Sequence, residues 1–255
     1  MTALKIWVDA QESQPILVFA SGFLTEAEIN EPLQSWTESI LRFATERGWS
    51  AAGVYWGSRG FRHLAYDYKD ARSIPFDIVT NWRSAKENIE TAALKLKDYL
   101  SAFKGRDIYL VGHSLGARLW LRVCEILPKH SIKKLILLAP ACKQTDFDFN
   151  KITEANKEPT VCFYSKDDFV LTKLYPLAES PQAFVCSALG VLPLKIASVA
   201  IVTQFGYSKM KNKALGAYVH KIKNFKFVDA SDKFNRSIGH LTYMDMLYPI
   251  LKSEI

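Results

Sequence analysis

Apolar positions along the chain follow two spacings, which predict strands alternating with helices. Short apolar runs typical of buried strands lie around residues 5–8, 16–20, 50–56, 107–111, 133–140, 160–165 and 224–231. Apolar residues spaced about 3.6 apart predict helices over residues 25–48, 77–103, 115–128 and 240–251. This alternation requires crossover connections, so we expect an α/β fold with a mostly parallel sheet and helices on both faces. No internal repeat or low-complexity tract divides the chain, so we expect residues 1–255 to form a single domain.

One segment does not fit this alternation. Residues 183–202, AFVCSALGVLPLKIASVAIV, hold a single charge, and their length meets the roughly 20 residues that a membrane span needs. Pro193 would interrupt a helix and Lys195 would be costly at mid-bilayer, so we do not expect a span. Residues 208–226 follow with six lysines and no acidic residue. We expect a helical insertion or lid near residues 175–222, which either packs over the sheet or docks on an anionic membrane surface.

The overall charge is moderately basic. Lysines and arginines number 33 against 26 aspartates and glutamates, which gives a net charge of +7. This excess favours contact with anionic surfaces such as phospholipid headgroups, and it serves solubility equally well. The sequence has no DNA- or RNA-binding motif and no basic patch interleaved with aromatic residues, so we expect no nucleic-acid partner.

The cysteines and the N-terminus indicate a reducing compartment. The cysteines are Cys124, Cys142, Cys162 and Cys186. They form no C-x-x-C pair and no metal-type spacing, and each lies in an apolar segment, so we expect buried free thiols, no metal and no cofactor. Residues 1–15 lack the continuous apolar stretch of a secretory signal, which predicts a cytoplasmic protein.

The most specific motif is GHSLG at residues 112–116, which fits the pattern G-x-S-x-G. A predicted strand runs into the motif and a predicted helix begins after Ser114, as a nucleophile elbow requires. In such an elbow the serine adopts a positive φ, and the flanking glycines let the strand and the helix pass closely. The N-terminus of the helix then directs backbone N–H groups with partial positive charge toward the serine.

A serine hydroxyl becomes a good nucleophile only when a base takes its proton and an acid orients that base. In folds with this elbow the order along the chain is Ser, then Asp or Glu, then His. Asp167 and Asp168 directly follow the predicted strand at 160–165. We prefer Asp168 because the apolar residues 169–171 would bury its loop, and Asp167 is the alternative. Either carboxylate could instead serve only as a helix cap.

The candidate base is one of five histidines. His240 follows the last predicted strand and opens the predicted C-terminal helix, so both its order and its position suit the role. His130 follows a helix end, and His220 lies among lysines. His63 and His113 precede the acid, and we expect the His113 side chain to point away from that of the serine. We therefore predict that His240 is the base.

Two backbone N–H groups are needed to stabilise an oxyanion. One is expected from Leu115, the residue after the nucleophile, and the other from the loop after an early strand. That loop contains Gly22, which permits an open backbone, and we expect the N–H of Phe23 to be the second donor. The same residues can also form an ordinary turn into a helix capped by Thr25.

These motifs resemble those of the α/β-hydrolase superfamily, and more narrowly a lipase-like group that includes the transmembrane and coiled-coil domain hydrolases. The matching stretches are VFASGFLTE, VGHSLGARLW, LLAPA, FYSKDDFVL and VDASDKFNRSIGHLTY, within residues 16–251. The resemblance implies that Ser114 is the nucleophile, Asp168 the acid and His240 the base. The chain departs from many relatives at residues 20–22, where ASG replaces His-Gly, and it lacks the membrane spans of the eukaryotic members.

The sequence thus predicts a serine hydrolase, a lipase or esterase that cleaves acyl-lipids or other apolar esters through an acyl-enzyme. An acyltransferase or a thioesterase would use the same three residues. A protein that keeps the fold only as a binding module is the alternative from another class. A missing triad member would indicate such a module, and all three residue types are present in the required order.

Overall fold

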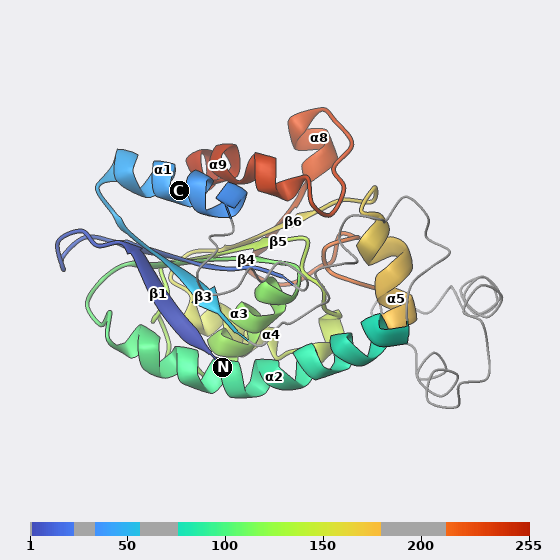
Figure 1. Ribbon diagram of the computed structural model, residues 1–255, viewed down its shortest axis with the longest axis horizontal. Coiled ribbons are helices and arrows are strands. Elements are labelled where there is room, and N and C mark those ends of the chain that lie inside the picture. The colour runs from blue at the N-terminus through green and yellow to red at the C-terminus, as the bar shows by residue number, and fades with distance from the viewer. Residues whose placement is uncertain (1, 23–33, 57–75, 180–212) are drawn as a thin grey trace.

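The computed structural model describes residues 2–22, 34–56, 76–179 and 213–255, and in these ranges a seven-stranded sheet forms the centre (Figure 1). Its strands are β1 (Ala3–Val8), β2 (Ile16–Ala20), β3 (Ser50–Tyr55), β4 (Ile108–His113), β5 (Lys134–Leu138), β6 (Thr160–Tyr164) and β7 (Phe225–Asp229). Their order across the sheet is β1-β3-β2-β4-β5-β6-β7. β1 pairs with β3 antiparallel and every other pairing is parallel, which confirms the predicted mostly parallel sheet.

Helices cover both faces of this sheet, as the alternation of elements predicts (Figure 1). One face carries α1 (Gln34–Arg47), α8 (Ala230–Phe234) and α9 (Tyr243–Glu254). The other face carries α2 (Phe76–Ser101), α3 (Leu115–Ile126) and α4 (Phe149–Ala155). Shorter elements are a 3₁₀ turn η3 (Gln144–Asp146), a π-helical turn η4 (Val170–Leu174) and α5 (Tyr175–Ala178). The arrangement is an α/β-hydrolase-like fold.

The register of the central strands brings their carboxyl ends to one edge of the sheet. Ala20 at the end of β2 is paired with Gly112 near the end of β4, and His113 is paired with Leu138 of β5. All residues of β2 and β4 are buried, because helices cover both faces of a parallel sheet. The loops that leave β2, β4 and β5 therefore begin side by side on a rigid base.

Two boundaries differ from the prediction at the C-terminal end. The last strand, predicted over residues 224–231, ends at Asp229, whose carboxylate accepts hydrogen bonds from the N–H groups of Ser231 and Asp232 and so begins α8. The last helix, predicted from residue 240, begins at Tyr243. His240 lies in the preceding turn, in which the N–H of Gly239 donates to Thr242 Oγ1.

The described end of the predicted insertion, residues 213–222, is not helical. Its backbone passes between the loops that follow β5 and β6: the N–H of Gly216 donates to Pro140 O at 3.1 Å, and Gly216 O accepts from the N–H of Ser165 at 3.0 Å. A Cβ at position 216 would lie 2.4 Å from the carbonyl carbon of Ala139, so only glycine fits there. Hydrogen bonds to these loops replace the bonds that a helix would make.

Several predicted features lie outside the described residues. Among them are the capping residue Thr25 and the apolar stretch 183–202. No helix in the described ranges combines the length and hydropathy that crossing a bilayer requires.

Candidate active site

Ser114 occupies a strained turn between β4 and α3. Its φ of 55° and ψ of −118° are a conformation that side-chain-bearing residues rarely adopt. The turn is held by the bond from the Ser114 N–H to Leu138 O, at 2.9 Å. The flanking glycines are required by contact: a Cβ at Gly112 would lie 2.7 Å from Ala117 Cα, and one at Gly116 would lie 2.2 Å from Ala20 O. The backbone thus has the elbow geometry that the motif predicts.

Three polar side chains from distant parts of the chain meet at this turn. His240 Nε2 lies 3.0 Å from Ser114 Oγ, and His240 Nδ1 lies 2.7 Å from Asp168 Oδ2. With a proton on Nδ1 the imidazole donates to Asp168, which leaves Nε2 free to accept from the serine hydroxyl. The structure therefore brings together the three residues predicted to form the triad.

The carboxylate of Asp168 is buried and held by hydrogen bonds. Its side chain is 0 % exposed, and Oδ1 accepts a hydrogen bond from the N–H of Leu171 at 3.0 Å. The backbone carbonyl of Asp168 accepts from Thr172 Oγ1 at 2.7 Å, which fixes the loop as well as the carboxylate. Asp167, the alternative, is exposed and accepts from Ser231 Oγ at 3.2 Å. Of the two adjacent acids, only Asp168 contacts His240.

The loop after β2 lies directly beside the serine. A Cβ at Gly22 would lie 2.6 Å from Ser114 Cβ, so this loop passes as close as a glycine allows. Trp56 Nε1 donates to Ser21 O at 3.3 Å and braces the same loop. The N–H of Leu115 belongs to the first turn of α3, where a helix offers it no internal acceptor. Phe23 lies outside the described residues, and its place remains a prediction.

The sequence matches the profile of the lipid-droplet associated hydrolases over residues 67–233, which is more than half of the chain. The chain belongs to this family. The match confirms the expected superfamily. The matched range includes Ser114 and Asp168, whereas His240 follows it.

The solved structures to which this family member is similar have low sequence identity to it. Est1E from Butyrivibrio proteoclasticus has 15 % identity and a TM-score of 0.47, with 99 % of this chain and 91 % of that chain covered. A predicted CIB-like hydrolase from Thermoplasma acidophilum has 13 % identity and a TM-score of 0.47, with 99 % and 92 % covered. The esterase domain of a Rhodothermus marinus protein has 15 % identity and a TM-score of 0.39, with 97 % and 87 % covered. No curated protein matches the chain.

The other histidines of this family member take different places. His130 is exposed, and His220 is buried with Nδ1 at 3.3 Å from Gln144 Oε1. His63 lies outside the described residues. His113 directly contacts the site, because its Nε2 lies 2.9 Å from the carbonyl oxygen of His240. We expected the His113 side chain to point away from that of the serine, and its contact with the main chain of His240 was not predicted.

The ring of His113 lies next to the imidazole of His240, the ring of Tyr243 lies next to that of His113, and both carry no charge. Burial, followed by the charge of His240, lowers the pKa of His113 well below its usual value. Burial, followed by the negative charge of Asp168, raises the pKa of Tyr243 well above its usual value. Both rings are therefore uncharged at neutral pH, and neither adds a charge beside His240.

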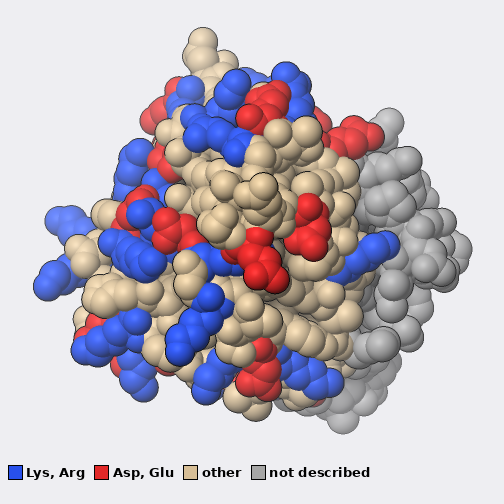
Figure 2. All heavy atoms as spheres, turned by 90° about the vertical axis from the view of Figure 1, so that its left-hand side faces the viewer, with Lys and Arg blue, Asp and Glu red and all other residues tan. Residues whose placement is uncertain are grey.

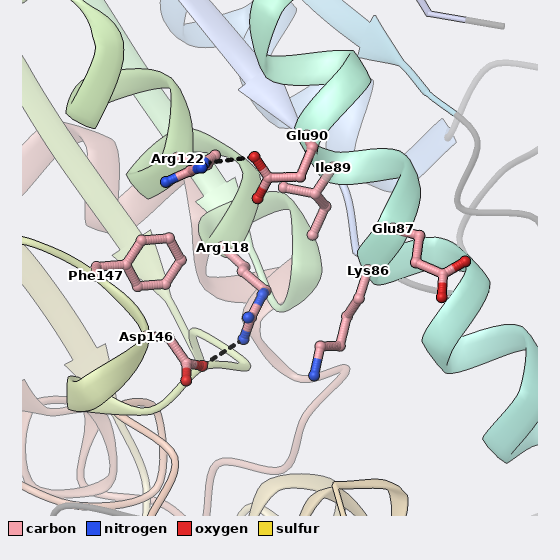
Figure 3. A pocket seen from close by; sticks show the side chains of 8 residues that line it. All are labelled: Lys86, Glu87, Ile89, Glu90, Arg118, Arg122, Asp146 and Phe147. Carbon is pink, nitrogen blue, oxygen red and sulfur yellow. Dashed lines mark hydrogen bonds and ion pairs between the residues drawn. The ribbon is translucent and has the colours of Figure 1, made fainter.

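A separate hollow of about 310 Å³ lies between α2, α3 and the segment that follows β5 (Figure 3). It is lined by Lys86, Glu87, Ile89, Glu90, Arg118, Arg122, Asp146 and Phe147. Figure 3 shows two of its basic side chains already paired, Arg118 with Asp146 at 2.6 Å and Arg122 with Glu90 at 2.7 Å. The hollow contains none of the three triad candidates, and we assign it no ligand.

Thiol and metal chemistry find no support among the described residues. In these ranges no group of three or more His, Cys, Asp or Glu side chains is placed to hold a metal ion. Burial raises the pKa of the Cys124 thiol to about 12 and that of Cys162 well above its usual value. These thiols stay protonated at neutral pH and are poor nucleophiles. Cys186 lies outside the described residues.

Proposed function

We propose that this family member is a serine hydrolase that cleaves carboxylic esters through an acyl-enzyme intermediate. The observation that carries the proposal is the hydrogen-bonded chain from Ser114 Oγ through His240 to Asp168, set on an elbow with φ of 55°. Ser114 is the nucleophile, His240 the general base and Asp168 the residue that orients the imidazole and stabilises its charged form.

The geometry supports a two-step reaction. Ser114 Oγ attacks the ester carbonyl carbon while His240 Nε2 takes the hydroxyl proton, and the N–H of Leu115 stabilises the oxyanion. His240 then gives this proton to the leaving alcohol, and the acyl group remains on Ser114. Water, activated by the same imidazole, releases the acid and restores the serine. The N–H of Phe23 is proposed as the second oxyanion donor, because the loop at Gly22 lies against Ser114.

Two exposed apolar residues next to the triad candidates in sequence support an apolar acyl group in the substrate. Phe169 and Leu241, which directly follow Asp168 and His240 in sequence, are 47 % and 50 % exposed. Exposed apolar side chains offer contact area to a hydrocarbon chain. Together with a family named for its association with lipid droplets, they support an acyl-lipid or another apolar ester as the substrate.

We also propose that the chain contacts anionic lipid surfaces peripherally. Within residues 208–226, which carry six lysines, Lys221 and Lys223 are exposed, and the nearby Val219 is 50 % exposed. Basic side chains near an apolar one favour an interface of anionic headgroups and acyl chains.

Turnover of nitrophenyl esters of short and long acyl chains, with and without anionic vesicles, tests this function. We expect long-chain esters to be preferred and vesicles to increase the rate. Ser114→Ala should lower turnover by about 10⁶-fold. A strict preference for short-chain esters, with rates unaffected by vesicles, would support an esterase and reject the acyl-lipid substrate. Turnover that persists in Ser114→Ala would contradict the proposed nucleophile. Added alcohol acceptors, with analysis of the products, distinguish hydrolysis from acyl transfer.

A further inference from the structure

His113 lies next to the imidazole of His240, at the end of the central strand β4. It is the last residue of β4, and its side chain is buried. Its ring centroid lies 4.7 Å from that of His240 and 4.9 Å from that of Trp36 on α1. Tyr243, the first residue of α9, lies 6.1 Å away by the same measure. The ring of His113 thus packs against two other parts of the chain, α1 and residues 240–243.

The contact between His113 and His240 has a defined direction. His113 Nε2 lies 2.9 Å from the carbonyl oxygen of His240. A carbonyl oxygen only accepts, so Nε2 carries the hydrogen and donates it. The titratable groups that face this ring among the described residues are His240 and Tyr243, and Trp36 is uncharged. Burial lowers the pKa of His113 well below its usual value, so it stays neutral and adds no second positive charge beside His240.

The hydrogen bond from His113 holds the main chain of His240, which the hydrogen bonds of the triad do not hold. The hydrogen bonds to Ser114 and Asp168 hold only the ring nitrogens, whereas His240 itself lies in the non-helical turn between α8 and α9. His113 is anchored on the central strand and is covalently joined to Ser114. The bond therefore ties the backbone of the base to the residue next to the nucleophile, independently of Asp168.

We propose that His113 is a positioning residue that holds the main chain of His240 so that its imidazole meets Ser114 Oγ. His113 does not contact the reacting hydroxyl, which is bonded to His240. The inference rests on the proposed function, since it concerns the geometry of the same three residues.

A donor-replacement series tests the proposal. His113→Leu keeps an apolar side chain but removes the donor, and His113→Gln restores an N–H at a similar reach. His130→Asn is the matched control, because His130 is exposed and has a φ of 55°, which asparagine tolerates. We expect His113→Leu to lower kcat by about 10- to 100-fold with KM changed less than about twofold, since small misplacements of a base have effects of this size. His113→Gln should recover activity to within about threefold of the wild type.

Three readouts keep the test decisive. Rates are normalised to the concentration of active sites titrated by a fluorophosphonate. The apparent pKa of the acid limb of the pH–rate profile should shift in His113→Leu but not in His113→Gln. Equal losses in both variants, or wild-type kcat in a folded His113→Leu, would overturn the proposal. Nitrogen-15 NMR of histidine in the wild type should show His113 as the neutral tautomer protonated at Nε2. A charged His113 ring, or a ring protonated at Nδ1, would overturn the proposal regardless of the kinetics of the variants. A wild type that has the Nε2 tautomer but no esterase activity would reject only the proposed function.

Discussion

At the scale of single residues, two adjacent carboxylates make different contacts. Asp168 is fully buried and bonded to His240, whereas Asp167 is exposed and bonded to Ser231. We predict that Asp168→Asn lowers kcat by about 10⁴-fold, because an amide no longer orients and stabilises the imidazole. Asp167→Asn should leave kcat within about threefold of the wild type. Steady-state kinetics on one soluble ester measures both, and equal losses would contradict the assignment of Asp168.

Gly22 gives a second prediction at this scale. A Cβ at this position would lie 2.6 Å from Ser114 Cβ, so Gly22→Ala must displace either the serine or the loop beside it. We expect kcat to fall by about 10- to 100-fold. Gly48→Ala is the matched control: no atom lies within 4 Å of its Cβ, but its φ is +67°. It should lower the melting temperature and leave kcat per folded molecule unchanged. Unchanged kcat in Gly22→Ala would show that the loop is not part of the site.

The sequence located these residues only in part. The GHSLG motif and the order Ser, Asp, His along the strands pointed to Ser114 and His240 as candidates and limited the acid to Asp167 or Asp168. The choice between Asp167 and Asp168 depended on burial of the loop, and the structure adds the bond from the Leu171 N–H that fixes the direction of Asp168. The bond from His113 was not predictable, because it depends on how the turn before α9 lies across the sheet.

At the scale of elements, Glu179 connects α5 to α2. Its carboxylate accepts from Lys86 Nζ at 2.6 Å and from Trp82 Nε1 at 2.9 Å, and Lys143 Nζ lies 3.5 Å away. Glu179→Ala would leave these donors without their common acceptor, and we expect it to lower the free energy of unfolding by about 2–3 kcal/mol. Glu154→Ala, which removes an exposed ion pair with Lys129, should have almost no effect. Urea denaturation measures both.

The same carboxylate predicts a pH dependence. Burial alone would raise the pKa of Glu179, but the hydrogen bond and charge of Lys86 and the N–H of Trp82 outweigh it, so the pKa lies below the ordinary value of 4.5. A pKa lowered by folding stabilises the protein above that ordinary value and ceases to do so as the pH falls through the folded-state pKa. The stability difference between the wild type and Glu179→Gln should therefore shrink as the pH falls from 7 to below 4.5. A constant difference would contradict the pairing.

The end of β7 could not be predicted from the spacing of apolar residues. The apolar run of the last strand continues into Ala230, yet β7 ends at Asp229 because this carboxylate caps α8. A strand and a helix cap compete for the same few residues, and apolar spacing does not report the cap. The type and order of the central elements, by contrast, follow from short apolar runs that alternate with helical spacing, which is typical of strands covered on both faces.

At the scale of the whole molecule, the charge is distributed rather than concentrated on the face shown in Figure 2. Lysines and arginines there lie interspersed with aspartates and glutamates. Several pairs are close, as between Lys157 and Asp107 at 3.0 Å and between Lys133 and Glu158 at 3.5 Å. The net charge of +7 thus does not by itself identify a binding face, and the exposed lysines at 221 and 223 remain the more specific candidates.

Burial of the thiols gives a prediction for the folded molecule as a unit. Cys124, Cys142 and Cys162 are buried, and burial raises the pKa of each thiol, to about 12 for Cys124. We expect iodoacetamide at pH 8 to leave these three unmodified in the native protein and to modify them in urea. Mass spectrometry of the digested protein resolves each site. Rapid native modification of any of the three would show that the core opens around it.

The central claim is that His240 activates Ser114. Reaction with a fluorophosphonate, followed by mass spectrometry of the tryptic peptides, tests it most directly, because the reagent reports the activated serine without requiring the natural substrate. We predict a single adduct on Ser114, absent in Ser114→Ala and formed at least about 100-fold more slowly in His240→Ala. An adduct on another serine, or equal labelling rates in the wild type and His240→Ala, would contradict the claim.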